Sequence, residues 1–194
     1  MLKEGYLLSD KTISVDFQNI KDNKMLIVGL SGSGKTTLGK KLSKHLNMKL
    51  RSIDDCPFDW HKFKSNPKLK EKILNDYWDC CSKMLLDNKK GILEGVGIIE
   101  VYERRPSIRR SILKFPCIII GASALKSSYR ANKQRGKDKA FNLFFYEVNF
   151  KLYQKMLNKF RKDRTNITGA QVKEYNVSKM TENKIVENYL KEIQ

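Results

Sequence analysis

The sequence has no long apolar run and few residues that could bind a metal ion through thiolate or imidazole groups. No stretch approaches the eighteen or so apolar residues of a membrane span, and the N-terminus lacks the apolar core of a signal segment. The cysteines form no C-x-x-C pair, and neither histidine lies at metal-ligand spacing from them. We therefore expect a soluble cytoplasmic protein that uses no membrane and has free, buried thiols at Cys56, Cys80, Cys81 and Cys117.

Acidic residues are also scarce relative to basic ones. The 194 residues include 39 Lys or Arg and 21 Asp or Glu, for a formal net charge of +18. Much of the excess lies in residues 101–165, which contain seventeen basic and four acidic residues. Such a surface attracts polyanions: a nucleotide, a phosphorylated metabolite or a nucleic acid backbone. A solvated basic surface without a ligand has the same composition, so a nucleic acid partner remains an open alternative.

One glycine-rich stretch matches a known phosphate-binding pattern. Residues 29–36 read GLSGSGKT, which fits G-x-x-x-x-G-K-[ST]. Glycines allow successive backbone N–H groups to wrap around a triphosphate, Lys35 can reach the β- and γ-phosphates, and the Thr36 hydroxyl can ligate Mg²⁺. We therefore expect ATP and Mg²⁺ as cofactors. The expected binding residues are Gly29, Ser31, Gly32, Ser33, Gly34, Lys35, Thr36 and Thr37.

The flanking residues support this interpretation. Met25–Val28 is a short apolar run typical of a buried strand, and residues 36–47 follow with leucines at helical spacing. The helix would then begin beneath the phosphates, with the positive end of its dipole toward them. A Gly-Ser linker that happens to contain a lysine would not lie between a buried strand and an amphipathic helix.

Further strands and helices alternate along the chain. We predict strands at 49–53, 92–95, 117–120 and 171–177, and a half-buried edge strand at 12–17. Predicted helices follow an Asn66 cap, cover 141–160 and follow a Thr181 cap, whereas 98–102 is apolar but ambiguous. This order predicts a doubly wound, three-layer α/β fold around a mainly parallel five-stranded sheet. The whole chain, 1–194, would form one domain with a basic, lid-like insert at about 122–140.

Two large classes of phosphate-loop protein are disfavoured. A GTPase needs a guanine-reading N-K-x-D, but the nearest candidate after the loop, Asn132–Arg135, ends in arginine. A transport-type ATPase would carry L-S-G-G-Q and an apolar strand that ends in aspartate, whereas the strand at 117–120 runs into Gly121.

The chain resembles the small P-loop kinases over about residues 25–140. This group includes the nucleoside monophosphate, shikimate and gluconate kinases and the 5′-polynucleotide kinase domain. The matching residues are the loop, Asp54-Asp55 after the second strand, Glu94-Gly95 after the third, and the arginines after the fourth. Asp54-Asp55 followed by Trp60 is most similar to the FlaR-related adenylate-kinase-like proteins.

The resemblance implies roles for particular residues. Asp54 would contact the acceptor hydroxyl and orient or deprotonate it, with Asp55 as the second choice, although both could instead cap the following turn. Glu94 would hold Mg²⁺ or a substrate hydroxyl, and Arg130 and Arg135 would neutralise the transferring phosphoryl group unless they lie in a plain solvated loop.

The acceptor itself is less defined by the sequence. Trp60, together with Phe58 and Phe63, could stack on a base or sugar or simply pack. We therefore expect a kinase that acts on a small acceptor, such as a nucleoside or nucleotide. The alternative is a nucleic-acid-associated protein, either a 5′-end kinase or an ATP-regulated binder.

Overall fold

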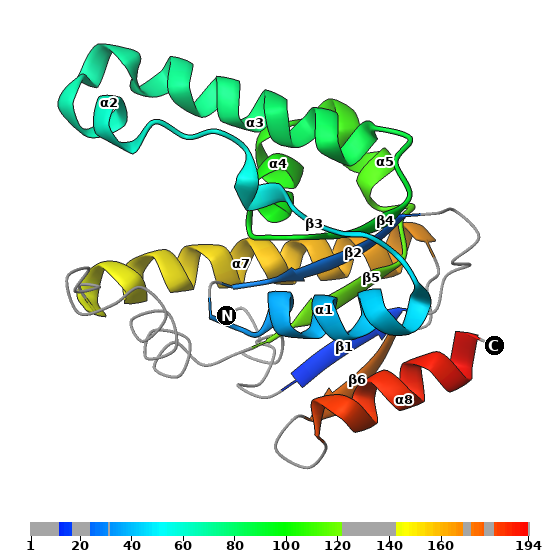
Figure 1. The fold of residues 1–194 in the computed structure, drawn as a ribbon. Helices are drawn as coiled ribbons and strands as arrows, with labels where there is room; N and C mark the ends of the chain where they lie inside the picture. Colours follow the sequence, from blue (N-terminus) through cyan, green and yellow to red (C-terminus); the bar gives the residue numbers. More distant parts are fainter. Residues whose placement is uncertain are drawn as a thin grey trace.

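The structure is a computed structural model that describes residues 12–16, 24–30, 32–121, 143–168, 172–176 and 181–193. These residues form one sheet between two layers of helices (Figure 1). The strands are β1 (Thr12–Asp16), β2 (Lys24–Gly29), β3 (Leu50–Ser52), β4 (Gly91–Glu94), β5 (Cys117–Ile120) and β6 (Val172–Asn176). The helices are α1 (Lys35–Leu46), α2 (Trp60–Ser65), α3 (Lys70–Leu86), α4 (Gly97–Arg104), α5 (Arg109–Ile112), α7 (Leu143–Thr168) and α8 (Glu182–Ile193).

The strand order is β3-β4-β2-β5-β1-β6. The strands β3, β4, β2 and β5 are parallel neighbours, and β1 pairs antiparallel with both β5 and β6. After β2 the chain forms β3 at the edge of the sheet, and β4 then fills the position between β3 and β2. The next strand, β5, forms on the other side of β2. The strand order therefore reverses at β2, and in open α/β sheets ligands bind outside the carboxyl ends of the strands at such a switch point.

Alternating side chains of the central strands supply the two halves of the core. Leu26 and Val28 of β2 pack with apolar residues of α3, α4, α5 and α7. Met25 and Ile27, which point to the opposite face, pack with residues of α1 and α8. Each face of the sheet is thus covered by helices, which confirms the predicted three-layer α/β class.

The predicted number of strands was wrong. The described residues form six strands, because the N-terminal strand joins the same sheet as the five others. Its predicted position was wrong as well. The strand β1 lies between β5 and β6 rather than at an edge, and β6 is the edge strand on that side.

Most predicted helices and caps are confirmed. Asn66 accepts a hydrogen bond from the backbone N–H of Lys68, where a 3₁₀ turn (η3, Pro67–Leu69) leads into α3. Thr181 accepts one from Lys184 at the start of α8. The ambiguous segment 98–102 is helical and belongs to α4. Among the described helices, none combines the length and apolar character that crossing a membrane requires.

Candidate active site

The phosphate loop connects the carboxyl end of β2 to α1. Gly32 and Gly34 have φ values of 74° and 100°, in the left-handed region that favours glycine. A Cβ atom on Gly29 would lie 2.7 Å from the carbonyl oxygen of Ile120 and 2.8 Å from Ser33 Oγ. The loop backbone therefore needs its glycines at all three positions, as the pattern predicted. Ser31 lies outside the described residues.

Lys35 begins α1, and its amine lies over the loop. The residue is only 6% exposed, and Nζ donates to the carbonyl oxygen of Leu30 at 3.0 Å. Burial lowers the pKa of Lys35, while the nearby carboxylates of Asp54 and Glu94 act in the opposite direction. The three charged groups therefore converge on one edge of the sheet.

Thr36 and Glu94 meet directly across two elements. Thr36 Oγ1, on α1, donates to Glu94 Oε1 at 3.0 Å, and Glu94 ends β4 with only 3% of its surface exposed. Its second oxygen, Oε2, is buried and has no hydrogen-bond partner among the described residues. A buried carboxylate oxygen costs free energy unless something pairs with it.

This pair of oxygen ligands fits a magnesium ion. Mg²⁺ prefers oxygen ligands and in nucleotide sites takes only one or two from the protein, the rest coming from phosphates and water. The described part of the chain contains no group of three or more His, Cys, Asp or Glu side chains that could hold a metal ion without such help. Thr36 and the free oxygen of Glu94 would hold the ion beside the phosphates.

Asp54 lies beyond the end of its strand and caps a distant helix. It belongs to a 3₁₀ turn (η2, Ile53–Asp55), and its carboxylate accepts from the backbone N–H groups of Gly97 at 3.2 Å and Val96 at 3.4 Å. Gly95 makes this approach possible, since a Cβ there would lie 2.7 Å from Asp54 Oδ1. Asp54 therefore caps the N-terminus of α4.

Asp55 and the aromatic residues after it are placed differently from the expectation. Asp54 and Asp55 share the 3₁₀ turn rather than the end of a strand, and both are exposed. Phe58 and Phe63 pack on each other, with ring centroids 5.2 Å apart. Trp60 begins α2, but its side chain lies outside the described part, as do Arg130 and Arg135.

Sequence reasoning missed a second group of polar residues near Asp54. Glu100 of α4 accepts a hydrogen bond from the Tyr153 hydroxyl of α7, and Tyr77 of α3 packs against Gly97. A helical interpretation of 97–104 would have placed Gly97 and Glu100 on one face. No pattern in the sequence could have indicated that Tyr153, more than fifty residues away, joins them.

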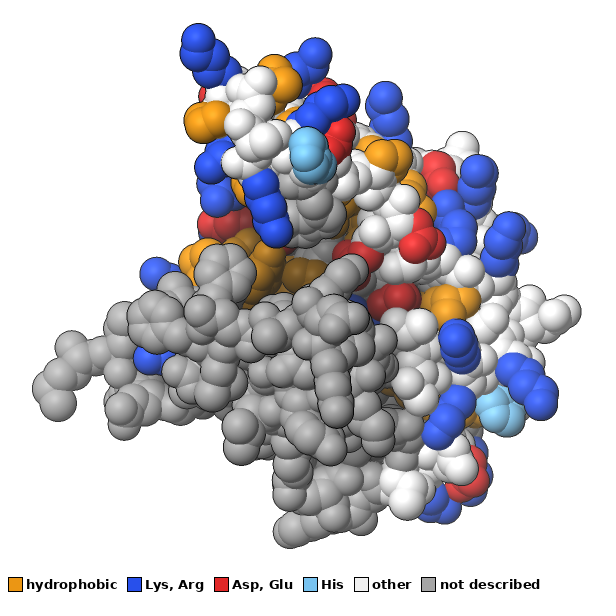
Figure 2. All heavy atoms as spheres, turned by 60° about the vertical axis from the view of Figure 1, so that its left-hand side comes forward, with side chains coloured by type: hydrophobic (Ala, Val, Ile, Leu, Met, Phe, Trp, Pro, Cys, Tyr) orange, Lys and Arg blue, Asp and Glu red, His pale blue; other side chains and the backbone are white. Residues whose placement is uncertain are grey.

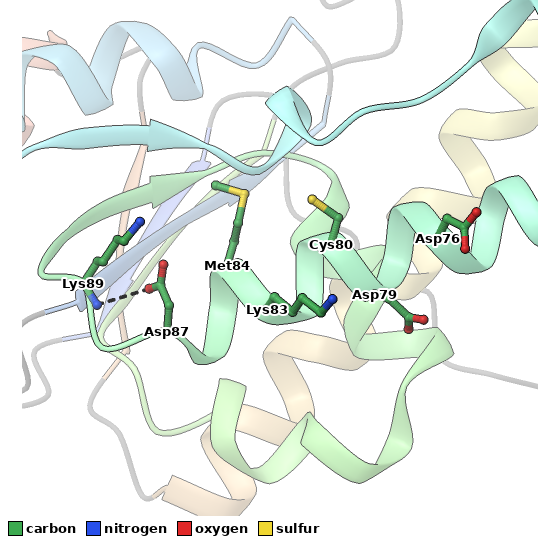
Figure 3. A pocket seen from close by; sticks show the side chains of 7 residues that line it. All are labelled: Asp76, Asp79, Cys80, Lys83, Met84, Asp87 and Lys89. Atoms are coloured by element: carbon green, nitrogen blue, oxygen red, sulfur yellow. Dashed lines mark hydrogen bonds between the residues drawn. The ribbon is translucent and has the colours of Figure 1, made fainter.

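A separate surface cavity of about 560 Å³ lies along α3, away from the phosphate loop (Figure 3). It is lined by Asp76, Asp79, Cys80, Lys83, Met84, Asp87 and Lys89. Behind it Cys56 and Cys81 are buried, and burial raises the pKa of both thiols, that of Cys81 to about 11. All four cysteines are free, although Cys80 is only half-buried, so the thiol prediction is confirmed for three of them.

Comparison with known proteins identifies the fold. No family model and no curated protein sequence matches the chain. Among solved structures, deoxyadenosine kinase from M. mycoides, with dCMP and dCDP bound, is 16% identical with a TM-score of 0.51; the match covers 88% of this chain and all of that one. YorR of Bacillus subtilis, in complex with phosphorylated GDP, is 14% identical with a TM-score of 0.48, covering 86% of this chain and 93% of that one. The first of these two matches shows that the chain has the fold of a small P-loop kinase.

Proposed function

We propose that this protein is a phosphotransferase that moves the γ-phosphoryl group of ATP to a hydroxyl or phosphate of a small acceptor, a nucleoside or nucleotide. The observation that supports it most strongly is the direct bond between Thr36 of the phosphate loop and the buried carboxylate of Glu94. This hydrogen bond joins the proposed triphosphate-binding loop to the proposed magnesium ligand. Asp54 lies close enough for its negative charge to raise the pKa of Lys35.

Each residue has a distinct part in this proposal. The loop N–H groups and Lys35 bind the phosphates, and Thr36 with Glu94 holds Mg²⁺, which neutralises charge on the phosphate oxygens. Asp54 orients an acceptor hydroxyl and takes its proton as the new P–O bond forms and ADP leaves. Two backbone donors occupy part of its carboxylate, yet its two oxygens offer about four acceptor sites, so capacity for a hydroxyl remains. Arg130 and Arg135 would stabilise the transferring group.

The first test concerns the loop lysine. Lys35→Ala should fold normally, as judged by circular dichroism, but lose the thermal stabilisation that ATP and Mg²⁺ give the wild type. That stabilisation should be about 2.7 kcal/mol at a ligand concentration of one hundred times Kd. Lys40→Ala, which removes an exposed lysine of the same helix, is the matched control and should retain the full effect.

The wild-type protein should transfer label from γ-labelled ATP to one class in a panel of nucleosides and nucleotides. An unchanged ATP-induced shift in Lys35→Ala would remove the nucleotide site from the proposal. Normal ATP binding without any labelled acceptor would instead rule out a small-molecule kinase.

A second candidate function follows from the charge. A net charge of +18, concentrated in residues 101–165, favours contact with a nucleic acid backbone. In that case the acceptor would be a 5′-hydroxyl end, or ATP would regulate binding without transfer.

A further inference from the structure

Three of the four cysteines meet where the 3₁₀ turn η2 packs on α3. Cys56 directly follows η2, and its backbone N–H donates to the carbonyl oxygen of Ile53 at 3.2 Å. The thiol of Cys81, on α3, donates to the same carbonyl oxygen at 3.8 Å. The thiol of Cys56 donates to the sulfur of Met84, also on α3, at 3.4 Å. Sulfur atoms from the turn and from the helix are therefore in direct contact.

Cys80 opens this cluster to solvent. It precedes Met84 by one helical turn, so the two side chains lie on one face of α3, and both line the cavity of about 560 Å³. Figure 3 shows their sulfur atoms on the same side of the helix. Cys56 and Cys81 are only 4% and 0% exposed, whereas Cys80 is half-buried. A small solute that enters the cavity therefore meets the thiol of Cys80 first.

The two buried thiols keep their protons. Burial is the main cause that raises the pKa of Cys56, and its hydrogen bonds with Cys80 and Cys81 raise it further. Burial also raises the pKa of Cys81, to about 11. Oxidants react with accessible thiols before buried ones, so Cys80 should be oxidised first. Because the Cys56 thiol is hydrogen-bonded to Cys80, a second thiol lies within reach of the oxidised product.

Cys56, rather than Cys81, is the thiol that can form a disulfide with Cys80. Cys80 and Cys81 are consecutive residues of α3, and the Cα atoms of consecutive residues are about 3.8 Å apart. Disulfides usually need a Cα separation of about 4.4–6.8 Å. A bond between these two neighbours is therefore disfavoured, whereas Cys56 approaches from a different element.

The charges around the cavity favour an uncharged oxidant. Aspartates and lysines line the wall together, and the carboxylate of Asp87 is already paired with Lys24 and Arg51. Lysines and arginines are spread over the described part of the face in Figure 2, with acidic side chains near its middle, and would draw an anionic oxidant to many places. Hydrogen peroxide has no charge and is far smaller than the cavity.

We propose that Cys80 is a site of reversible oxidation by hydrogen peroxide and that it then forms a disulfide with Cys56. The Cys80 thiolate attacks one peroxide oxygen, so that an S–O bond forms, the O–O bond breaks and hydroxide leaves, taking up the thiol proton as water. The Cys56 thiolate then attacks the Cys80 sulfur, the S–S bond forms, and the S–O bond breaks to release a second water. Two thiols are oxidised, and one peroxide is reduced to two waters.

This disulfide would act on the residue assigned to the acceptor. Cys56 lies two residues after Asp54, whose carboxylate accepts from the backbone at the start of α4. Pairing with Cys80 requires the Cys56 sulfur to move away from Met84, and this movement would shift the turn that carries Asp54. The effect on activity rests on the proposed phosphotransfer, in which a displacement of about 1 Å can cost about 10²-fold in rate.

The first test detects the disulfide without any activity. The full chain is treated with hydrogen peroxide, free thiols are alkylated in denaturant, and tryptic peptides are analysed by mass spectrometry. A link between peptides 52–62 and 73–83 should appear, fragmentation should place it at Cys56 and Cys80, and dithiothreitol should remove it. Cys80→Ala should abolish the link, whereas Cys117→Ala, which removes a buried thiol of β5, is the matched control and should retain it.

Three results would overturn the inference. Cys80 could remain a free thiol, it could proceed to sulfinic acid without any link, or the link could join Cys56 to Cys81. Each is read on the wild-type protein, so the test stays decisive if a variant does not fold.

Transfer of label from γ-labelled ATP separates this inference from the proposed function. The oxidised protein should transfer label at least tenfold more slowly and recover in dithiothreitol, and Cys80→Ala should be insensitive to peroxide. No transfer by the reduced protein would reject phosphotransfer and preserve the oxidation site. Transfer without any disulfide would reject the oxidation site, and a disulfide that leaves turnover unchanged would overturn its effect on Asp54.

Discussion

The carboxylate of Asp54 has one structural role and one proposed catalytic role. It caps the N-terminus of α4 through the backbone N–H groups of Val96 and Gly97, and the proposed mechanism also uses it to orient and deprotonate the acceptor. Capping the helix needs an oxygen that accepts hydrogen bonds, whereas deprotonating the acceptor needs a negative charge. A substitution that keeps the oxygen and removes the charge separates them.

Asp54→Asn should therefore reduce turnover far more than stability. Turnover should fall by about 10²–10⁴-fold, the usual contribution of a positioned general base. Stability should fall by only about 0.5–1 kcal/mol, because asparagine still caps a helix and only the interaction with the helix dipole is weakened. Steady-state kinetics and urea unfolding would measure the two effects, with ATP affinity expected to stay near the wild-type value.

Asp55→Asn is the matched comparison, since Asp55 is exposed in the same 3₁₀ turn. It should leave both turnover and stability almost unchanged. Equal losses in turnover at the two positions would contradict the assignment of Asp54.

At the scale of elements, a buried lysine ties α3 to the sheet. Lys24 of β2, only 4% exposed, donates through Nζ to the carbonyl oxygens of Met84, Leu85 and Asp87 at the end of α3. It also pairs with the Asp87 carboxylate at 2.8 Å, to which Arg51 of β3 donates from the other side at 2.6 Å. The free C-terminal carbonyls of α3 are thus satisfied by a cation from the sheet.

Asp87→Asn should destabilise the protein and change its response to acid. Hydrogen bonds from Arg51 and Lys24 hold the pKa of Asp87 well below its usual range. A depressed folded-state pKa contributes stability above the unfolded pKa of about 4, and this contribution is lost as the pH falls below that value. The variant should lose about 2 kcal/mol at pH 7, because Lys24 retains its carbonyl partners, and the difference from wild type should shrink below pH 4.

Urea unfolding at several pH values would measure this difference. Asp76→Asn, which changes an exposed acid of the same helix, is the control and should have little effect. A loss in Asp87→Asn that is the same at pH 7 and pH 3 would show that the ion pairs do not stabilise the fold in this way.

The elements themselves were largely predictable, because they depend on local patterns. Apolar runs indicated β2, β4 and β5, and the leucine spacing indicated α1. The position of β1 was not predictable, since an alternating segment has the same local pattern whether another strand pairs with its free side or not. The relation of Asp54 to α4 was equally hidden, because it depends on a contact across more than forty residues.

The residues of the candidate site also differ in how far the sequence could predict them. The phosphate-binding residues form one contiguous pattern whose backbone geometry follows from its glycines, so most of them could be predicted. Glu94 could be proposed only by resemblance. Its bond to Thr36 results from the register of β2 with β4, which aligns Ile27 with Glu94. Glu100, Tyr77 and Tyr153 come from three different helices, and only the packing of those helices brings them together.

At the scale of the whole molecule, the distribution of charge distinguishes the two candidate functions, phosphotransfer to a small acceptor and nucleic acid binding. The net charge is +18, yet the carboxylates of Asp54 and Glu94 lie at the edge of the sheet where transfer would occur. We expect the basic surface to bind polyanions without delivering them to that edge. A 5′-hydroxyl oligonucleotide should therefore bind weakly, with Kd of about 10⁻⁴–10⁻⁶ M at physiological salt, and should not receive label from γ-labelled ATP.

Salt and matched charge changes would test this expectation, with binding followed by fluorescence anisotropy between 50 and 200 mM salt. Log K for a single strand should fall linearly with log salt, with a slope of about −0.7 for each phosphate neutralised. K151E/K155E on the exposed side of α7 should make the slope shallower than K40E/K44E on α1, since the basic excess lies in residues 101–165. Saturating nucleoside should not displace the oligonucleotide, because the two would occupy different surfaces. Displacement by nucleoside, together with labelling of the 5′ end, would instead show that the strand enters the transfer site, and a 5′-end kinase would then be the better description.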